Sequence, residues 1–266
     1  MSDSAARPTP DEGYAIVVEG LTRKFRRQTA VDHVSFRVAR GRFFGFLGPN
    51  GAGKSTTIRM LTGLLRPSAG DAVIEGARLS GDLLALKRRI GVLTEDLALY
   101  ERLTGEEHLL FAARMHGLAP AEARRRTLEL LEFLTLADER GKLVVDYSQG
   151  MRKKLALACA LVHGPAVLFL DEPLNGIDPV SGRVVMDLLR RLTARGVTLF
   201  FTSHVLDVVE RLCDEVAVID HGRIVAQGTL DEIRAQRELG GGASLEDVYL
   251  KLVAADVTRE DLSWIS

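Results

Sequence analysis

The sequence predicts an α/β fold: a parallel sheet covered by helices, with an antiparallel β layer beside it and an inserted helical segment. Three observations support this prediction. A glycine-rich loop, residues 48–56, connects an apolar strand to a helix. Strand and helix patterns alternate along residues 148–219, as they do in proteins whose helices cover a parallel sheet. Between these regions, residues 96–147 show helical patterns without strand signals, which indicates the insertion.

We expect the antiparallel layer to come from the N-terminal elements. Residues 1–13 are polar and carry two prolines, so they are predicted to be disordered. Tyr14–Glu19 and Val34–Val38 have the apolar pattern of strands, and the basic stretch Arg23–Arg27 is predicted as a turn between them. Asp71–Glu75, which is flanked by glycines, is the third expected strand of this layer.

The glycine-rich loop has the composition of an anion site. It fits the phosphate-loop pattern GxxxxGK[ST] and follows a buried strand, Arg42–Leu47, while Thr56–Leu65 continues it as a helix. Its residues are Gly48, Pro49, Asn50, Gly51, Ala52, Gly53, Lys54, Ser55 and Thr56. In such a loop, backbone N–H groups and the helix dipole surround a phosphate. Lys54 would reach the β- and γ-phosphates and Ser55 would bind Mg²⁺, so the loop predicts a nucleoside triphosphate site.

The insertion follows a short strand, Ile90–Leu93, and contains two predicted helices. Thr104 and Glu107 have the spacing of a capping box and begin the first helix. Pro120 stands at a favoured first helical position, and leucines spaced along one face carry the second helix to about Leu136.

After the insertion, helices and strands are expected to alternate. The predicted elements are helix Met151–Val162, strand Ala166–Leu170, helix Pro179–Ala194, strand Val197–Phe201, helix Val205–Cys213 and strand Val216–Ile219.

Two acidic residues, Asp171 and Glu172, follow the buried strand of this series. A phosphate loop needs a second Mg²⁺ ligand, which Asp171 would supply. Glu172 lies on the opposite face of the strand, where it would polarise the attacking water as a general base. Adjacent acids at a strand end are also common in solvated turns, but the phosphate loop upstream favours the catalytic interpretation.

The C-terminal part is predicted to add a hairpin and short helices. Asp220–Gly222 forms a turn before a strand that ends near Ala226, and Thr229 caps a helix. Gly240–Gly242 is an expected flexible joint before the amphipathic helix Leu245–Leu252. The predicted domain organisation is therefore a disordered segment 1–13, an ATPase domain 14–228 with its helical part at about 96–147, and a helical tail 229–266.

Composition excludes some classes of protein. Lys and Arg number 35 against 36 Asp and Glu, a balance that argues against nucleic acid as a partner. Cys159 and Cys213 lack the spacing of metal ligands and are interpreted as small core residues in a reducing compartment. The most apolar stretch, 155–170, is interrupted by Gly164 and Pro165 and is too short to span a bilayer. We therefore expect a chain that does not itself cross a membrane.

Tyr147–Met151 carries the most specific resemblance. Its sequence, Tyr-Ser-Gln-Gly-Met, is similar to the Leu-Ser-Gly-Gly-Gln signature of ATP-binding-cassette (ABC) proteins and stands between the two nucleotide motifs. Over roughly Ala15–Gly228 the chain resembles the nucleotide-binding subunit of an ABC transporter. The resemblance implies a P-loop NTPase (RecA-like) core and a head-to-tail dimer, in which Ser148 and Gly150 of one subunit contact the γ-phosphate bound by the other. Ser148 is also a good helix N-cap, so capping is the alternative role.

Further site residues are implied by the same resemblance. His204 matches the histidine that contacts the γ-phosphate. Asp178, in a segment similar to the loop that bridges the two sites, would contribute to the nucleotide site or cap a helix. Phe25 would stack on adenine or pack in the core. Glu95 stands where most members of the family carry a glutamine, so metal contact is one reading of it, and contact with solvent or a basic permease residue is the other.

The implied function is that of an ATP- and Mg²⁺-dependent ATPase subunit that drives an ABC transporter. It would work as a homodimer or heterodimer with a separate membrane permease, at the cytoplasmic face of the cell membrane. The segments 221–228 and 244–249 resemble the bacterial drug, polysaccharide and lipid export branch. A soluble ABC protein of translation or DNA repair is disfavoured because the chain has neither a second cassette nor a long coiled coil. An ATP-gated scaffold is disfavoured by Glu172.

Overall fold

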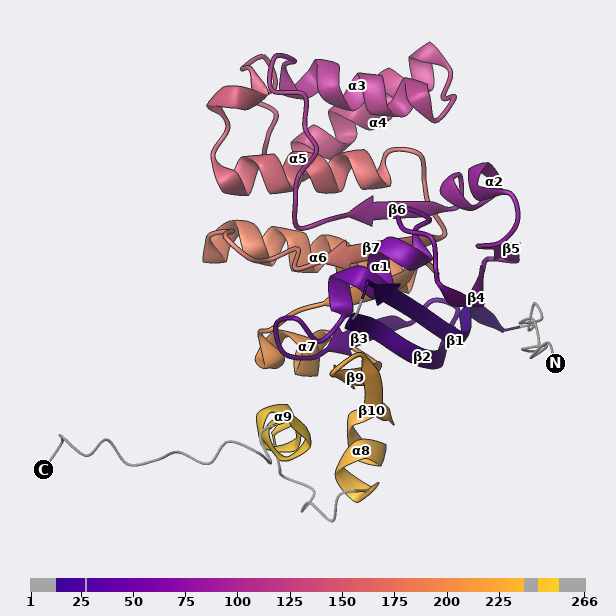
Figure 1. The fold of residues 1–266 in the computed structure, drawn as a ribbon. Coiled ribbons are helices and arrows are strands. Elements are labelled where there is room, and N and C mark those ends of the chain that lie inside the picture. Colours follow the sequence, from indigo (N-terminus) through magenta and orange to yellow (C-terminus); the bar gives the residue numbers. More distant parts are fainter. Residues whose placement is uncertain (1–12, 27, 237–243, 254–266) are drawn as a thin grey trace, which may run out of the picture.

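Strands rich in apolar residues form the central sheet of the computed structural model, which describes residues 13–26, 28–236 and 244–253. Their order is β10-β9-β3-β8-β7-β6 (Figure 1). The bounds are β3 Phe43–Leu47, β6 Ile90–Leu93, β7 Val167–Asp171, β8 Thr198–Thr202, β9 Glu215–Asp220 and β10 Arg223–Gly228. All pairs are parallel except β9 with β10, which is antiparallel. The carboxyl ends of β3 and β7 therefore lie at the same edge of the sheet, and both predicted nucleotide motifs follow them.

Side chains alternate between the two faces of the central sheet and form two hydrophobic clusters. Phe44 and Phe200, whose ring centroids lie 5.6 Å apart, pack on the face that is covered by the N-terminal sheet. Phe43 and Phe201 pack on the opposite face, toward the helical insertion. Burial on both faces fixes the strands that carry the candidate site residues.

A second, antiparallel sheet has the order β2-β1-β4-β5. Its strands are β1 Tyr14–Phe25, β2 Gln28–Ala39, β4 Ala69–Ile74 and β5 Ala77–Arg78. The prediction of a basic turn over Arg23–Arg27 was wrong in extent, because β1 continues to Phe25 and β2 begins at Gln28. Shifts in the β1–β2 register break the strict alternation of apolar and polar residues, which hides this part of both strands in the sequence.

The helical insertion packs as a layer at one end of the molecule (Figure 1). It consists of α3 Gly105–Met115, α4 Pro120–Phe133 and the short 3₁₀ helix Val144–Asp146, and it packs against α5 Gln149–Leu161. Thr104 forms the predicted capping box with Glu107, since each side chain bonds the backbone N–H of the other residue. Pro120 is the first residue of α4. The sequence thus identified both helix starts correctly.

The remaining helices are α1 Lys54–Leu61, α2 Leu83–Lys87, α6 Pro179–Ala194, α7 Leu206–Leu212, α8 Leu230–Gln236 and α9 Leu245–Val253. Helix α1 is shorter than predicted because Gly63, with φ of 69°, turns the chain just beyond it, and Leu64 is exposed. Helix α2 was not predicted, since five residues are too few to display a helical period.

Two predicted segments fall largely outside the described residues. These are the N-terminal segment 1–13, of which only Gly13 is described, and the glycine joint Gly240–Gly242. Helix α9, the amphipathic helix expected at the C-terminal end, packs against α7 through buried Leu245 and Val248. In the described part of the chain, no helix combines the length and apolarity needed to cross a membrane.

Candidate nucleotide site

The phosphate loop lies so close to two neighbouring segments that two of its positions have no room for a side chain. A Cβ atom on Gly48 would lie 2.2 Å from the carbonyl oxygen of Ile219 in β9. A Cβ atom on Gly53 would lie 2.6 Å from the carbonyl oxygen of Ala30 in β2, and Gly53 also has a φ of 113° as the N-cap of α1. Only glycine fits at either position, so the loop takes its shape from β2 and β9 as well as from its own sequence.

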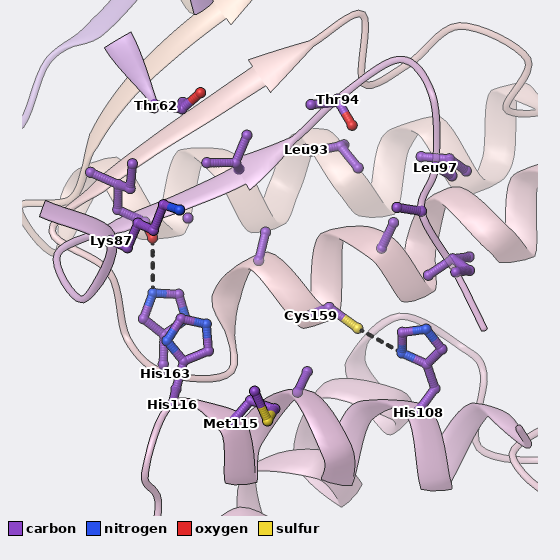
Figure 2. A pocket seen from close by; sticks show the side chains of 18 of the residues that line it. Thr62, Lys87, Leu93, Thr94, Leu97, His108, Met115, His116, Cys159 and His163 are labelled. Carbon is purple, nitrogen blue, oxygen red and sulfur yellow. Dashed lines mark hydrogen bonds between the residues drawn. The ribbon is translucent and has the colours of Figure 1, made fainter. Parts of the chain in front are cut away.

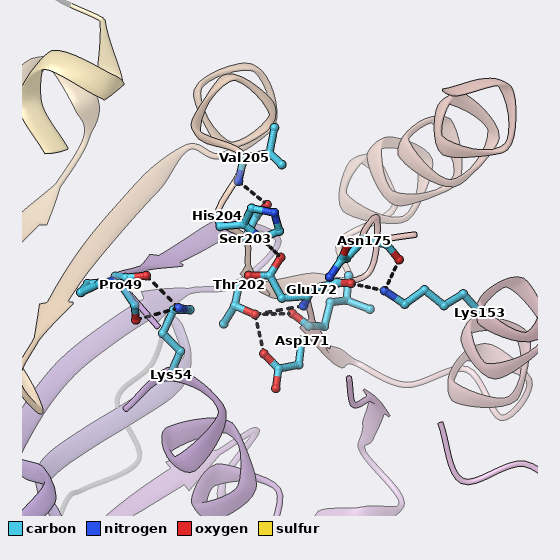
Figure 3. Close-up of polar contacts among 12 residues, drawn as sticks. Pro49, Lys54, Lys153, Asp171, Glu172, Asn175, Thr202, Ser203, His204 and Val205 are labelled. Atoms are coloured by element: carbon cyan, nitrogen blue, oxygen red, sulfur yellow. Dashed lines mark hydrogen bonds and ion pairs between the residues drawn. The ribbon is translucent and has the colours of Figure 1, made fainter. Parts of the chain in front are cut away.

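Lys54 is buried at the start of α1, and its ammonium lies over the loop. It donates to the carbonyl oxygens of Gly48 at 2.7 Å and Pro49 at 3.1 Å (Figure 3). Burial lowers the pKa of Lys54, while the carboxylates of Glu172, Asp171 and Glu95 act to raise it. An ammonium has three N–H donors, so the third remains available to an anion.

Asp171 ends β7 with its carboxylate almost completely buried. One carboxylate oxygen accepts a hydrogen bond from the Thr202 hydroxyl at 2.7 Å, and Thr202 stands at the end of the neighbouring strand β8. The same hydroxyl accepts from the backbone N–H of Glu172 at 3.1 Å. Thr202 therefore fixes both acidic residues, a contact that joins positions far apart in the sequence and was not predicted.

Glu172 leaves the strand in a left-handed backbone conformation, with φ of 49°. Its carboxylate can only accept hydrogen bonds, and it does so from the Nδ1 of His204 at 2.9 Å. The imidazole is half-exposed, whereas the carboxylate is largely buried. This arrangement presents an oriented carboxylate beside the phosphate loop, as a general base requires.

These residues line one cavity of about 420 Å³ at the carboxyl edge of the sheet. The lining consists of Asn50, Gly51, Gly53, Lys54, Ser55, Thr56, Glu95, Asp171, Glu172, Asn175 and His204. Glu95 comes from the segment after β6, so the acid that departs from the family pattern does face this cavity. Asn175 was not among the expected site residues, and its place in the lining is new.

Gly48 and Pro49 instead border a smaller cavity of about 190 Å³ next to His204. Its remaining lining includes Tyr249 of α9, so the C-terminal helix reaches the back of the phosphate loop. This contact was not predicted, because it depends on how α9 packs against α7.

Four of the expected site residues outside the phosphate loop lie away from the main cavity. Ser148 is exposed and caps α5 by accepting from the backbone N–H of Met151 at 3.2 Å. Gly150 has open space where a Cβ would stand. Asp178 caps α6 by accepting from Val180 and Ser181, and these bonds lower its pKa. The capping roles foreseen for Ser148 and Asp178 are thus present in the single chain.

Phe25 is the fourth of these residues. It ends β1 with 43% of its surface exposed, and the Arg23 guanidinium lies 4.6 Å above its ring. A core-packing role does not fit this exposure. The ring is accessible for stacking, although it is not among the residues that line the main cavity.

A second hollow, of about 450 Å³, lies between β6 and the helical insertion (Figure 2). Most of its lining is apolar and includes Leu97, Phe111 and Met115. At one end of it the rings of His116 and His163 are stacked with centroids 3.7 Å apart, and His163 contacts the Ile90 carbonyl oxygen. We call this hollow the insertion groove.

Comparison with known proteins gives a consistent result. Residues 31–175 match the family model described as ABC transporter. The daunorubicin resistance ATP-binding protein DrrA3 of Streptomyces coeruleorubidus is 41% identical over 94% of this chain and 82% of its own length. The linearmycin resistance ATP-binding protein LnrL of Bacillus subtilis is 36% identical over 86% of this chain and 73% of its own length.

Comparison with solved structures supports the same family. An ATP-binding subunit of an ABC transporter superposes with a TM-score of 0.85 at 36% identity, covering 90% of this chain and 99% of its own. The dimeric cassette MJ0796 bound to ADP and Pi has a TM-score of 0.75 at 23% identity, over 81% of this chain and 98% of its own, and supports the fold alone. The predicted fold class is confirmed, and the chain belongs to the ABC transporter family as an ATP-binding subunit.

Proposed function

We propose that this chain is the ATP-hydrolysing subunit of an ABC exporter and that it drives a separately encoded membrane permease. The observation that carries the proposal is the single cavity in which the phosphate-loop lysine, two strand-end acids and a histidine converge. The drug-resistance names of the relatives favour export as the direction of transport. Glu172 favours hydrolysis over a role as an ATP-gated scaffold.

In this proposal the phosphate loop binds the triphosphate. Its N–H groups and the start of α1 would surround the β-phosphate, while the third N–H of Lys54 would contact the β- and γ-oxygens. Asp171 accepts one bond from Thr202 and keeps further lone pairs, so with the Ser55 hydroxyl and Glu95 it forms an oxygen donor set that suits Mg²⁺. The metal, when bound, would neutralise charge on the phosphates.

Glu172 is proposed as the general base that takes a proton from the attacking water. Burial and the bond from His204 hold its carboxylate in one orientation. With its other ring nitrogen, His204 would contact the γ-phosphate. Positioning and charge are the main contributions a protein makes to phosphoryl transfer, and all of these groups come from the ends of β3, β7 and β8.

We further propose that two subunits share each site, head to tail. Ser148 and Gly150 do not line the cavity of their own chain; Ser148 is exposed, and Gly150 has open space where a Cβ would stand. These two residues would contact the γ-phosphate bound in the partner subunit, with the Asp178 segment bridging the two sites. Phe25, accessible at the end of β1, would stack on adenine.

The insertion groove is the proposed docking site of the permease. Around it, Tyr100 is 58% exposed and Met115 is 71% exposed, which is a large apolar surface to leave in water. Residues 96–147, proposed as the helical part of a domain that spans 14–228, supply one wall of it. Docking there would hold the chain at the cytoplasmic face of the cell membrane.

Glu172→Gln tests the proposal because it keeps the shape of the side chain but removes the base. ATP should still bind, while hydrolysis should fall by a factor on the order of 10² to 10⁴. The purified variant should accumulate as an ATP-bound dimer, measured by size-exclusion chromatography at saturating ATP and Mg²⁺. A variant that hydrolyses at the wild-type rate would refute the base, and one that stays monomeric would refute the shared site.

A further inference from the structure

Lys153 lies on the inner face of α5, one turn after the N-cap Ser148, and is only 4% exposed. Its ammonium donates to the carbonyl oxygens of Glu172 at 2.5 Å and Asn175 at 2.6 Å (Figure 3). A cation buried this deeply needs hydrogen-bonded partners, and both of its partners belong to the loop that carries the proposed base.

The backbone of Glu172 is the reason this contact matters. A non-glycine residue rarely adopts a left-handed conformation, so the surrounding structure must hold it there. The Thr202 hydroxyl accepts from the N–H of Glu172, and Lys153 donates to its C=O. Both backbone polar groups of the residue are therefore held from outside the loop, which leaves the carboxylate little freedom.

The charge of Lys153 also acts on the site. Burial lowers the pKa of Lys153, and the carboxylates of Glu172, Glu95 and Asp171 oppose that shift. These three acids line the nucleotide cavity. Lys153 is thus a cation behind the cavity wall, where it partly balances the acids without entering the cavity itself.

A second contact ties α5 to the same loop. Gly176 has a φ of 73°, and a Cβ placed on it would lie 2.7 Å from the side-chain nitrogen of Gln149. The first turns of α5 therefore pack against residues 172–176 at two points, through Gln149 and Lys153.

Lys154, the next residue of α5, provides the contrast. It is 5% exposed, and burial lowers its pKa as well. Its ammonium, however, donates to the Thr135 hydroxyl at 2.9 Å, in the segment that follows α4. Two adjacent lysines with the same burial thus have different partners: one holds the nucleotide site and the other holds the helical insertion.

We propose that Lys153 is a positioning residue for hydrolysis: it fixes the backbone of Glu172 and joins the signature helix α5 to the base of its own subunit. The inference rests on the proposed function, in which Glu172 is the base. Ser148 at the start of α5 is proposed to contact the partner's ATP. Lys153 would therefore couple closure of the dimer to alignment of Glu172.

Lys153→Met removes the ammonium but keeps a long apolar side chain. We expect kcat for ATP to fall by about 10- to 100-fold, since a small displacement of a catalytic group has an effect of this size. KM and equilibrium ATP affinity should stay within about twofold, because the phosphate loop is untouched. Lys154→Met is the matched control, and its kcat should remain within about twofold of wild type. Lys153→Arg, which keeps the charge and several donors, should recover most of the lost kcat.

Equal kcat in Lys153→Met and Lys154→Met, or a raised KM with unchanged kcat, would overturn the inference. If Lys153→Met does not fold, as judged by circular dichroism, Lys153→Arg and Lys153→Gln decide. A higher kcat in the arginine variant supports the role of the cation, and equal values overturn it. A wild-type chain that does not hydrolyse ATP would refute the proposed function instead, so the two failures are distinguishable.

Discussion

The nucleotide cavity and the insertion groove have similar volumes, about 420 and 450 Å³, but opposite linings. Four of the eleven residues that line the cavity are charged: Lys54, Glu95, Asp171 and Glu172. Among the described residues that line the groove, none is acidic and Lys87 is the single charged side chain. These linings fit the two proposed roles, an anion site for the cavity and an apolar docking surface for the groove.

One segment of the chain contributes to the lining of both the insertion groove and the nucleotide cavity. Residues 90–94 line the groove, and Glu95, the next residue, lines the cavity. A partner that shifts this segment would therefore move a carboxylate beside the triphosphate. The proposed sites of chemistry and of docking thus have separate linings but are one peptide bond apart in the chain, between Thr94 and Glu95. Three predictions test whether the nucleotide cavity and the insertion groove can be altered independently.

Lys54→Ala should have the largest effect. It removes the cation from the cavity, and no other residue of the phosphate loop is basic. A hydrogen bond to a charged group contributes about 1.5–3 kcal/mol, so losing the contacts to the β- and γ-oxygens should lower ATP affinity by about 100-fold or more and abolish hydrolysis. Lys87→Ala is the control, because it removes a cation from the groove. Equal ATP affinity in the two variants, measured by calorimetry, would show that the cavity is not the nucleotide site.

Phe111→Glu should have an intermediate effect, and it should affect permease binding rather than ATP hydrolysis. Phe111 is 43% exposed on α3 in the groove, where a glutamate would become an unpaired charge once a partner covers it. We expect co-purification of the permease with the tagged chain to fall by about tenfold, while ATP hydrolysis by the isolated chain is unchanged. Leu250→Glu, at a similarly exposed position on α9, should have no effect. Normal permease binding by the Phe111 variant would exclude the groove as the docking site.

The parts of the site that sequence could predict lie within short motifs. The loop 48–56 and the pair Asp171 and Glu172 each follow a buried strand, so local pattern alone places them at one sheet edge. Thr202 and Lys153 could not be found in this way. Each contacts Glu172 from a different element, and nothing in the residues around them shows which neighbour they will meet.

The fold shows the same difference between features that a local sequence pattern predicts and features that it does not. Strands buried on both faces, such as β3 and β7, were predicted almost to the residue because all their positions are buried and, apart from Asp171 at the end of β7, apolar. The β1–β2 hairpin was not, because register shifts interrupt its alternation, and the glycine at position 63 ended α1 before its apolar pattern ended. Where the backbone departs from regular strand or helix geometry, the spacing of apolar residues no longer predicts the bounds of the element.

The smallest effect should come from Glu95→Gln, at the junction of the two hollows. Glu95 is exposed, lines the cavity and acts on Lys54, so its negative charge reaches the nucleotide site. A carboxylate near a triphosphate is repelled unless Mg²⁺ lies between them. Hydrolysis should therefore depend less steeply on Mg²⁺ in the variant. Since an exposed charge pair contributes about 0.2–1 kcal/mol, we expect the half-saturating Mg²⁺ concentration to change by about two- to fivefold. Asp96→Asn, which neutralises the neighbouring exposed acid outside the cavity, is the control. If titrations of free Mg²⁺ superimpose for the wild-type chain and both variants, Glu95 is not close to the metal, and contact with the permease is the role that remains for it.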